Sequence, residues 1–229
     1  MIRDPHHFPI FGHRGSPRRF RENTTDSFEG ALREGADGFE TDLRLLADGV
    51  AVLFHDDDLN GRPVETLTSA EVSAQRVSDL GRFAAHTTMI LEVKRGDWVD
   101  ALLKEIGAWQ KIVVASFDHS LIAELAHRKV HFPLGITVSG VIVDLPDYAQ
   151  RLGARWCFPD HHYVDAELVA ALHAAAIDVV PWTPNRAEDW MRLREIGCDG
   201  VITDYPAEAV KWRAKLSALP QQHRGEGRT

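Results

Sequence analysis

Residues 178–203 read DVVPWTPNRAEDWMRLREIGCDGVIT, and this stretch contains one complete β/α unit. The short apolar runs Asp178–Trp182 and Gly200–Thr203 are typical of buried strands. Between them, Glu188–Gly197 is amphipathic and ends at a glycine, as helices commonly do. Consecutive strands that are joined by a helical crossover are parallel. The stretch therefore predicts a βαβ unit.

The same rhythm continues through most of the chain. Six further strands are predicted at Pro9–His13, Asp37–Leu43, Thr88–Val93, Lys111–Phe117, Pro133–Val138 and Arg155–Phe158. Further helices are predicted at Thr24–Glu34, Trp98–Trp109, Ser120–Arg128, Asp147–Gly153, Ala166–Ala176 and Pro206–Leu216. Eight such units in roughly 200 residues are typical of an α/β fold of the (β/α)8 barrel type. A doubly wound open sheet is the alternative, but eight strands without a break between domains favour a single barrel over about residues 9–216.

Residues 42–56, DLRLLADGVAVLFHD, depart from a plain barrel. Asp48-Gly49 is a strong signal for a two-residue hairpin turn, and apolar, strand-like arms flank it on both sides. If these two residues form the tip, Asp42 lies opposite His55, and directly opposed Cβ atoms are about 4.5–5.5 Å apart. The hairpin therefore predicts a histidine folded back onto an acidic residue at the end of the second strand.

Two segments fall outside the β/α rhythm. Residues 57–87 lack a clear barrel unit, and we interpret them as a short insertion above the barrel mouth, where insertions can shape substrate choice. The tail, from about residue 217 to residue 229, is polar and contains glycine, so we expect it to be disordered. The whole chain is interpreted as one domain.

Composition limits the classes of partner. The 229 residues carry a formal net charge of -8, which argues against a nucleic-acid backbone as the main partner. The two cysteines, Cys157 and Cys198, have no CxxC spacing and are expected to be buried free thiols. No run reaches the ~20 apolar residues that a membrane span needs, and the N-terminus lacks an apolar core of signal-peptide length. We therefore expect a cytoplasmic protein without stable membrane insertion.

Charged residues gather at the predicted strand ends, where barrel enzymes place their catalytic groups. Glu40 and Asp42 are two residues apart and so lie on one face of the second strand, and Glu92 ends the third. Crowded carboxylates repel one another unless a cation lies among them. A divalent ion with oxygen ligands, Ca²⁺ or Mg²⁺, satisfies this requirement. The three acids are therefore the predicted metal ligands, and simple pairing of these acids with Arg14 and Lys94 is the alternative.

The remaining charges at these strand ends suit a phosphate. Arg14 and Lys94 would face an anion beside the metal, since arginine can bind two oxygens and a divalent ion can neutralise the rest. His13 and His55 are placed to act as general acid and base, because the imidazole group ordinarily titrates near neutrality. The pairs His6-His7 and His161-His162 are interpreted as surface or loop residues, with a metal role left open.

Three further motifs carry weaker signals. Glu22-Asn23-Thr24 precedes the first helix, where Asn23 or Thr24 can act as an N-cap, and a catalytic role is the alternative. Ser116-Phe117-Asp118 and Trp182-Thr183 end the fourth and seventh strands and so can line the mouth. For Trp182, contact with substrate and simple packing are equally expected.

The ordered set of motifs resembles the glycerophosphodiester phosphodiesterase family. The motifs that carry the resemblance are HRG (13–15), ENT (22–24), ExD (40–42), HD (55–56), ExK (92–94), SFD (116–118), PWTPN (181–185) and GCDGVITDYP (197–206). Each motif alone is weak, whereas the series in this order and spacing, over about residues 10–210, is specific.

The resemblance implies a triosephosphate-isomerase-type barrel with a small insertion after the HD motif. It implies a divalent metal, Ca²⁺ or Mg²⁺, on Glu40, Asp42 and Glu92, paired catalytic histidines at His13 and His55, and phosphate contacts from Arg14 and Lys94. The implied substrates are small glycerophosphodiesters, which are cleaved to an alcohol and sn-glycerol 3-phosphate. The implied route begins with attack of the adjacent glycerol hydroxyl on phosphorus, and water then opens the cyclic phosphate.

Three positions differ from the family pattern. Arg21 stands where proline usually precedes Glu-Asn-Thr, the usual Arg-Thr-Thr after the HD motif is missing, and the usual Pro-Thr-Leu before Glu92 is absent. All three lie outside the predicted metal and histidine residues, so they bear on headgroup choice more than on the reaction.

Other functions remain as alternatives. A related phosphodiester lyase would stop at the cyclic phosphate, and a lysophospholipid phosphodiesterase would need a longer apolar surface around the mouth. A different metal-dependent barrel enzyme, acting on a carboxylate substrate, is disfavoured by the two histidines and the Arg14/Lys94 pair. A non-catalytic phosphate-binding protein is the alternative outside enzymes, because a fold alone does not guarantee activity. The sequence leaves the oligomeric state, the headgroup and the physiological metal open.

Overall fold

A computed structural model describes residues 8–217 of the chain. Eight parallel strands form its centre, in the order β11-β10-β9-β8-β7-β2-β1-β12. They are β1 (Ile10–Gly12), β2 (Gly38–Leu45), β7 (Thr88–Val93), β8 (Ile112–Ser116), β9 (Leu134–Val138), β10 (Trp156–Pro159), β11 (Asp178–Val179) and β12 (Val201–Thr203). The eight strands predicted from the sequence are these strands, with small differences at their ends.

The sheet closes on itself just after β11. Trp182 forms parallel bridges to Asp160, after β10, and to Ile202 in β12. The amide of Ile202 donates to the carbonyl of Pro181 at 2.9 Å. β11 is shorter than predicted because Pro181 has no N–H to continue the ladder. The predicted (β/α)8 barrel is confirmed.

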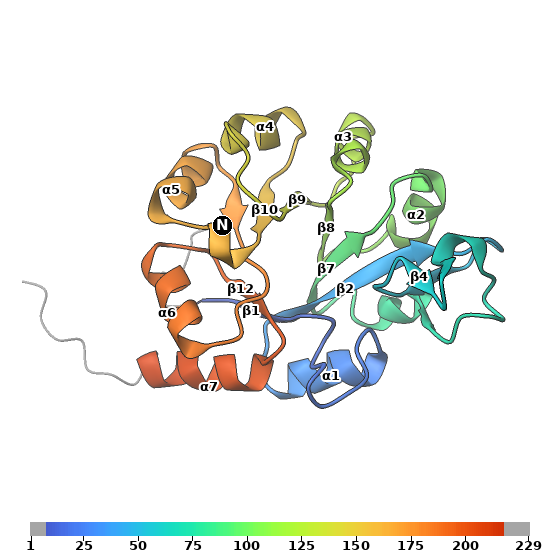
Figure 1. Ribbon diagram of the computed structural model, residues 1–229, viewed down its shortest axis with the longest axis horizontal. Helices are drawn as coiled ribbons and strands as arrows, with labels where there is room; N and C mark the ends of the chain where they lie inside the picture. The colour runs from blue at the N-terminus through green and yellow to red at the C-terminus, as the bar shows by residue number, and fades with distance from the viewer. Residues whose placement is uncertain (1–7, 218–229) are drawn as a thin grey trace, which may run out of the picture.

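Helices surround the strands as a ring, which Figure 1 shows in a view along the barrel. They are α1 (Thr25–Arg33), α2 (Val99–Ile106), α3 (His119–His127), α4 (Leu145–Arg151), α5 (Ala166–Ala174), α6 (Ala187–Glu195) and α7 (Pro206–Ser217). Several begin where a side-chain oxygen accepts a bond from the first turn: Thr24 caps α1, Asp118 caps α3 and Asp165 caps α5. The predicted disordered tail lies outside the described residues, apart from residue 217 at the end of α7.

The strands alternate between two hydrophobic environments. On β7, Met89 and Leu91 belong to the large cluster beneath the helices, whereas Ile90 belongs to a smaller cluster with Phe11, Val113, Phe158 and Ile202. Successive side chains of a strand point to opposite faces, so the smaller cluster fills the barrel interior. The inward positions at the carboxyl ends of the strands are therefore left for polar residues.

The hairpin after β2 forms, but its register differs from the prediction. β3 (Ala51–Leu53) pairs antiparallel with β2, and Leu45 lies opposite Ala51. The amide of Gly49 donates to the carbonyl of Leu46 at 2.9 Å, and Gly49 has φ +77°. These features define a three-residue loop that ends in a left-handed glycine, not a two-residue turn.

The predicted opposition of Asp42 and His55 is therefore wrong by one residue. Phe54 takes the position opposite Asp42, and its amide donates to the Asp42 carbonyl at 3.1 Å. One extra residue in the loop shifts every pair along the ribbon by one, because the register is set by the turn. His55 lies beyond this pair, on the chain that leads into the insertion.

The insertion has two parts. The first contains β4 (Asp58–Leu59), β5 (Arg62–Pro63) and the 3₁₀ helix η1 (Val64–Thr66), and its small apolar cluster includes Val64 and Leu67. The second contains β6 (Gln75–Arg76), which pairs with β3, and the 3₁₀ helix η2 (Val77–Arg82), whose Val77 and Leu80 join the main core. The structure describes all of residues 46–87, and it contains no α-helix there between β2 and β7. The 3₁₀ helix η2 takes the place of that barrel helix.

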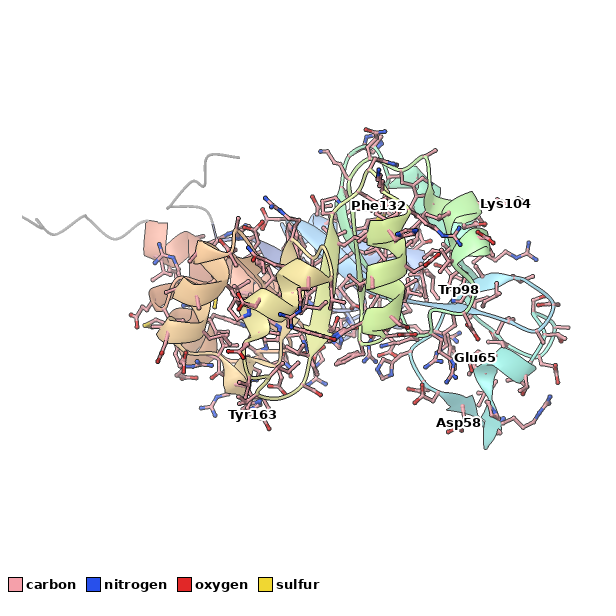
Figure 2. The ribbon with its side chains drawn as sticks, turned by 90° about the horizontal axis from the view of Figure 1, so that it is seen from above. Asp58, Glu65, Trp98, Lys104, Phe132 and Tyr163 are labelled. Carbon is pink, nitrogen blue, oxygen red and sulfur yellow. The ribbon has the colours of Figure 1, made fainter. Side chains whose placement is uncertain are left out.

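Figure 2 shows which side of the molecule the insertion faces. Asp58 and Glu65, in the first part, and Tyr163, which follows β10, lie toward the same lower edge of the view. Phe132, which precedes β9, lies near the opposite edge. The first part of the insertion therefore projects to the side of the molecule where the strands end.

Candidate active site

A cavity of about 260 Å³ opens where the barrel strands end. Its lining includes every residue predicted as a metal ligand, histidine catalyst or phosphate contact, together with an apolar part: His13, Arg14, Glu40, Asp42, His55, Ile90, Glu92, Lys94, Ala115, Phe117, Thr137, Phe158, Trp182, Thr183 and Ile202. Glu22 and Asn23 line an adjoining cavity of about 350 Å³, which shares His55. The structure thus brings residues from distant parts of the chain to one mouth.

Three carboxylates form the acidic side of the cavity. Strand pairing sets Asp42 beside Glu92, and Glu40 lies on the same face of β2 two residues earlier. One oxygen from each carboxylate can be chosen so that all three lie within 4.8 Å of one another. This donor set of hard oxygens fits a divalent cation such as Ca²⁺ or Mg²⁺.

Burial makes these acids unequal. Burial and the charge of Asp42 raise the pKa of Glu40 to about 8, and burial also raises the pKa of Glu92. Burial acts in the same direction on Asp42, but the charges of Lys94 and Arg14 outweigh it and lower the pKa of Asp42. Asp42 is therefore the most acidic of the three carboxyl groups.

Two cations neutralise part of the acidic side. Lys94 Nζ lies 2.7 Å from Asp42 Oδ1 and also forms an ion pair with Glu92. Arg14 Nε lies 3.3 Å from Asp42 Oδ2. Glu40 receives the backbone N–H of Arg14 at 3.1 Å on one oxygen, while its other oxygen, Oε1, is buried without a hydrogen-bond partner among the described residues. That unsatisfied oxygen is a second reason why a cation fits this site.

His13 is held by an acidic residue that the sequence analysis did not assign a role. His13 Nδ1 lies 2.7 Å from Asp204 Oδ1, and Asn185 Nδ2 donates to the other Asp204 oxygen at 2.8 Å. An ionised carboxylate can only accept, so Nδ1 carries the proton and Nε2 of a neutral ring has a free lone pair. Nε2 lies 3.9 Å from Glu40 Oε2. Burial acts to lower the pKa of His13, but the bond to Asp204 and the charge of Glu40 raise it overall.

His55 has a similar partner. Its Nδ1 lies 2.8 Å from Asp56 Oδ1, so the same argument leaves Nε2 free. The His55 side chain is 37% exposed, whereas that of His13 is 20% exposed. Both rings line the cavity, and each is fixed through Nδ1 by an aspartate.

Residues of the ENT motif bind two of the residues that line the cavity, Arg14 and Asp42. Asn23 is buried, donates through Nδ2 to Asp42 Oδ2 at 2.8 Å and accepts the Thr41 hydroxyl at 2.8 Å. Glu22 accepts from Arg14 Nη1 at 3.0 Å. Thr24, and not Asn23, is the N-cap of α1. Asn23 and Glu22 therefore hold the proposed metal ligand and the proposed phosphate contact.

Aromatic side chains form another part of the cavity lining. Phe117 and Trp182 meet edge to face with ring centroids 5.6 Å apart, and the Trp182 indole donates to the Phe158 carbonyl at 2.9 Å. Phe117 is 45% exposed. The cavity can therefore contact both a polar anion and a carbon skeleton.

Asp204 and Asn185 are the supporting residues that the sequence analysis missed. Asp204 directly follows β12, whose Thr203 pairs with Gly12 of β1, so closure of the barrel sets Asp204 beside His13. The sequence could have predicted this pairing, because the first and eighth strands of a closed barrel are neighbours, and His13 and Asp204 follow these two strands.

The second histidine pair does not line this cavity, although the His161 amide donates to the carbonyl of Trp182 at 2.8 Å. His161 and His162 belong to the 3₁₀ helix η3 (His161–Tyr163), and both the amide and the ring Nδ1 of His162 contact Asp160. Asp160, His161 and His162 also have ligand atoms within 4.8 Å of one another. His6 and His7 lie outside the described residues.

The two cysteines are free and buried, as predicted. Within residues 8–217, none of the helices is both long enough and apolar enough to cross a membrane.

Comparisons with known proteins agree with this geometry. The profile of the Glycerophosphoryl diester phosphodiesterase family matches residues 13–87 and 83–208. A glycerophosphodiester phosphodiesterase of Bacillus altitudinis is 27% identical over an alignment of 241 positions, which covers 90% of this chain and 98% of that protein. One from Caldanaerobacter subterraneus is 27% identical over an alignment of 235 positions, which covers 88% of this chain and 96% of that protein.

Two solved structures share the fold. The crystal structure of the glycerophosphodiester phosphodiesterase from Thermotoga maritima has a TM-score of 0.77 and 23% identity, covering 90% of this chain and 98% of its own. An Oleispira antarctica phosphodiesterase in complex with the product sn-glycerol-3-phosphate has a TM-score of 0.82 and 20% identity, covering 89% of this chain and 96% of its own.

Proposed function

The chain belongs to the glycerophosphoryl diester phosphodiesterase family, and on that premise we propose that it hydrolyses glycerophosphodiesters to an alcohol and sn-glycerol 3-phosphate. The observation that carries the proposal is the cavity itself. Three carboxylates, two cations and two aspartate-fixed histidines line it, together with the aromatic side chains of Phe117 and Trp182. The product bound to the Oleispira antarctica protein supports the same class of substrate.

Glu40, Asp42 and Glu92 would hold a divalent cation, with Ca²⁺ and Mg²⁺ as the candidates. The unsatisfied oxygen of Glu40 and the raised pKa values of Glu40 and Glu92 support this assignment, since a cation stabilises the ionised carboxylates. A bound divalent ion supplies Lewis-acid polarisation of the phosphate oxygens. Arg14 and Lys94, on the same side of the cavity, would bind the remaining phosphate charge.

The two histidines would move the protons. One accepts the proton of the attacking hydroxyl through Nε2, and the other donates a proton from Nε2 to the leaving alcohol oxygen. With the adjacent glycerol hydroxyl as the nucleophile, the product of the first step is a cyclic phosphate. Water then opens it while the histidines exchange roles. Trp182 and Phe117 would contact the carbon skeleton of the substrate.

The test is release of glycerol 3-phosphate from glycerophosphocholine, glycerophosphoethanolamine and glycerophosphoglycerol. Each reaction is run with Ca²⁺, with Mg²⁺ and with EDTA, and cyclic phosphate is followed in parallel. We expect metal-dependent release, with loss of at least ~100-fold in His13→Ala and Glu40→Ala because each removes a group that acts in the transition state.

Two exposed residues provide matched controls, His162→Ala for the histidine and Glu188→Ala for the acid, and both should retain full activity. Absence of release from every diester with either metal would refute the proposal. Equal release in EDTA would refute the metal assignment alone. Accumulation of cyclic phosphate would identify a lyase.

A further inference from the structure

Arg44 is buried beside the candidate active site without lining its cavity. Its side chain is 1% exposed, and it is among the largest fully buried side chains of the described residues. It lies two residues beyond Asp42 on β2, so strand alternation puts it on the same face as Glu40 and Asp42. A charged group is rarely buried this deeply unless its partners compensate for the lost hydration.

The guanidinium of Arg44 joins three segments of chain. Nη2 donates to the carbonyl of His55 at 2.9 Å and to Asp57 Oδ1 at 2.5 Å. Nη1 donates to Glu65 Oε1, in the 3₁₀ helix η1, at 2.5 Å. The planar guanidinium of arginine has several N–H groups and can make these bonds simultaneously. The single ammonium of a lysine cannot reproduce the arrangement.

These contacts differ in how strongly solvent screens them. The Asp57 side chain is 96% exposed and that of Glu65 is 25% exposed. The ion pair with the exposed Asp57 therefore contributes little to stability, whereas solvent screens the pair with Glu65 less. The bond to the His55 carbonyl is a contact between a rigid barrel strand and the main chain of the residue that carries the ring.

His55 depends on such contacts because it lies past the end of regular structure. β3 ends at Leu53, and the last hairpin bond that precedes His55 is from the Phe54 amide to Asp42. The ring itself is held by Asp56, whose side chain is 71% exposed. The position of the His55 main chain therefore follows from Arg44 on one side and from the hairpin on the other.

We propose that Arg44 is a positioning residue, which fixes His55 by donating a hydrogen bond to its carbonyl. The proposal rests on the proposed function, in which His55 transfers a proton. Arg44 contacts both Glu65, in the first part of the insertion, and the main chain of His55 at the cavity. Arg44 makes no contact with substrate in this role.

A double-mutant cycle tests the proposal. Arg44→Met keeps an apolar stem and removes the guanidinium, and we expect kcat to fall by about 10–100-fold with KM changed by less than about threefold, because a small displacement of a catalytic group is costly. In the His55→Asn background the same substitution should change kcat by less than about twofold, since residues that act through one another are not additive. Arg44→Lys should restore part of the loss.

Glu65→Gln is the matched control. It removes the charge of Glu65 but leaves the bond from Arg44 to the His55 carbonyl, so kcat should remain within about twofold of the wild type. Equal loss of kcat from Arg44→Met in both backgrounds would show a merely structural role and overturn the proposal. A wild-type kcat in folded Arg44→Met, or an equal loss in Glu65→Gln, would also overturn it.

Crystal structures of Arg44→Met and Glu65→Gln give a readout that needs no turnover. We expect the His55 ring to be displaced in the first variant and to keep its place in the second. An unmoved ring in Arg44→Met would contradict the proposal. A wild-type protein without diesterase activity would instead refute the proposed function, while the two structures would still decide whether Arg44 fixes His55.

Discussion

Glu40 is buried, but it must be ionised to bind a metal. Its side chain is 5% exposed, one oxygen has no partner among the described residues, and burial together with the charge of Asp42 raises its pKa to about 8. From this raised pKa we expect the Glu40 carboxyl of the metal-free protein to be protonated at pH 7. A bound cation must displace that proton, because a metal ligand has to be deprotonated.

Metal affinity should therefore depend on pH in a defined direction. Below pH 8, binding releases about one proton from Glu40, so the apparent affinity should rise by up to about tenfold per pH unit and level off above about pH 8. Calorimetry with Ca²⁺ or Mg²⁺ in two buffers of different ionisation enthalpy measures this release at pH 7 and pH 9. Glu40→Gln should bind weakly and without that proton. Equal proton release at the two pH values would contradict the assignment of Glu40.

Asp204 should control both the orientation and the basicity of His13. Asp204→Asn removes the acceptor charge at His13 Nδ1, so the pKa of His13 should fall and kcat should drop by about 100-fold or more. A pH–rate profile should show the His13 limb moved to lower pH. Asp165→Asn, at the N-cap of α5, is the control and should leave kcat unchanged. An unchanged profile in folded Asp204→Asn would exclude this role.

At the scale of elements, the hairpin after β2 depends on one glycine. Gly49 has φ +77°, and a Cβ built there meets nothing within 4 Å, so a side chain would cost backbone strain but no steric clash. This residue makes the loop three residues long and thereby sets the register that leads to His55. Glycine adopts this left-handed conformation without the strain that other residues incur.

Gly49→Ala should therefore destabilise the protein by about 1 kcal/mol, which lowers Tm by about 2–4 °C in a chain of this size. Gly49→Asn should cost less, since asparagine tolerates this conformation better. Gly140→Ala is a matched control, because that position is equally open but has no positive φ. Thermal unfolding measures all three variants. An equal loss in Gly49→Ala and Gly140→Ala would show that the strain argument is wrong.

At the scale of the whole molecule, the core beneath the helices buries both thiols. Cys157 lies in β10 and Cys198 lies between α6 and β12, and both belong to the core cluster beneath the helices. Burial raises the thiol pKa of each to about 12. The thiolate is the reactive form, so neither side chain is available or activated in the folded protein.

Thiol labelling should therefore report global unfolding. In native buffer at pH 8 we expect no labelling of either cysteine over hours, and in guanidinium both should react, giving two labels per chain. Ser139→Cys, at an exposed position, should react within minutes and serves as the positive control. Rapid native labelling of Cys157 or Cys198 would reveal local opening of the barrel.

Much of the barrel and of its acidic side could be predicted from the sequence, because they depend on local patterns. Apolar runs and helical periodicity located the eight strands and the surrounding helices. The two-residue spacing of Glu40 and Asp42 was enough to place them on one face of a strand. Carboxyl ends of parallel strands meet at one mouth, so the convergence of these acids with Glu92 also followed from the pattern.

The tertiary structure alone decided what depends on a single turn or on distant contacts. The hairpin register was set by the backbone conformation of Gly49, and a two-residue turn was as consistent with the letters Asp-Gly. The pairing of His13 with Asp204, 191 positions apart, required the barrel to close. Arg44 reads as one more polar residue in a strand, and its burial against His55 arises only when the insertion folds back over β2. Local patterns determine secondary structure, whereas these contacts exist only where separate elements meet.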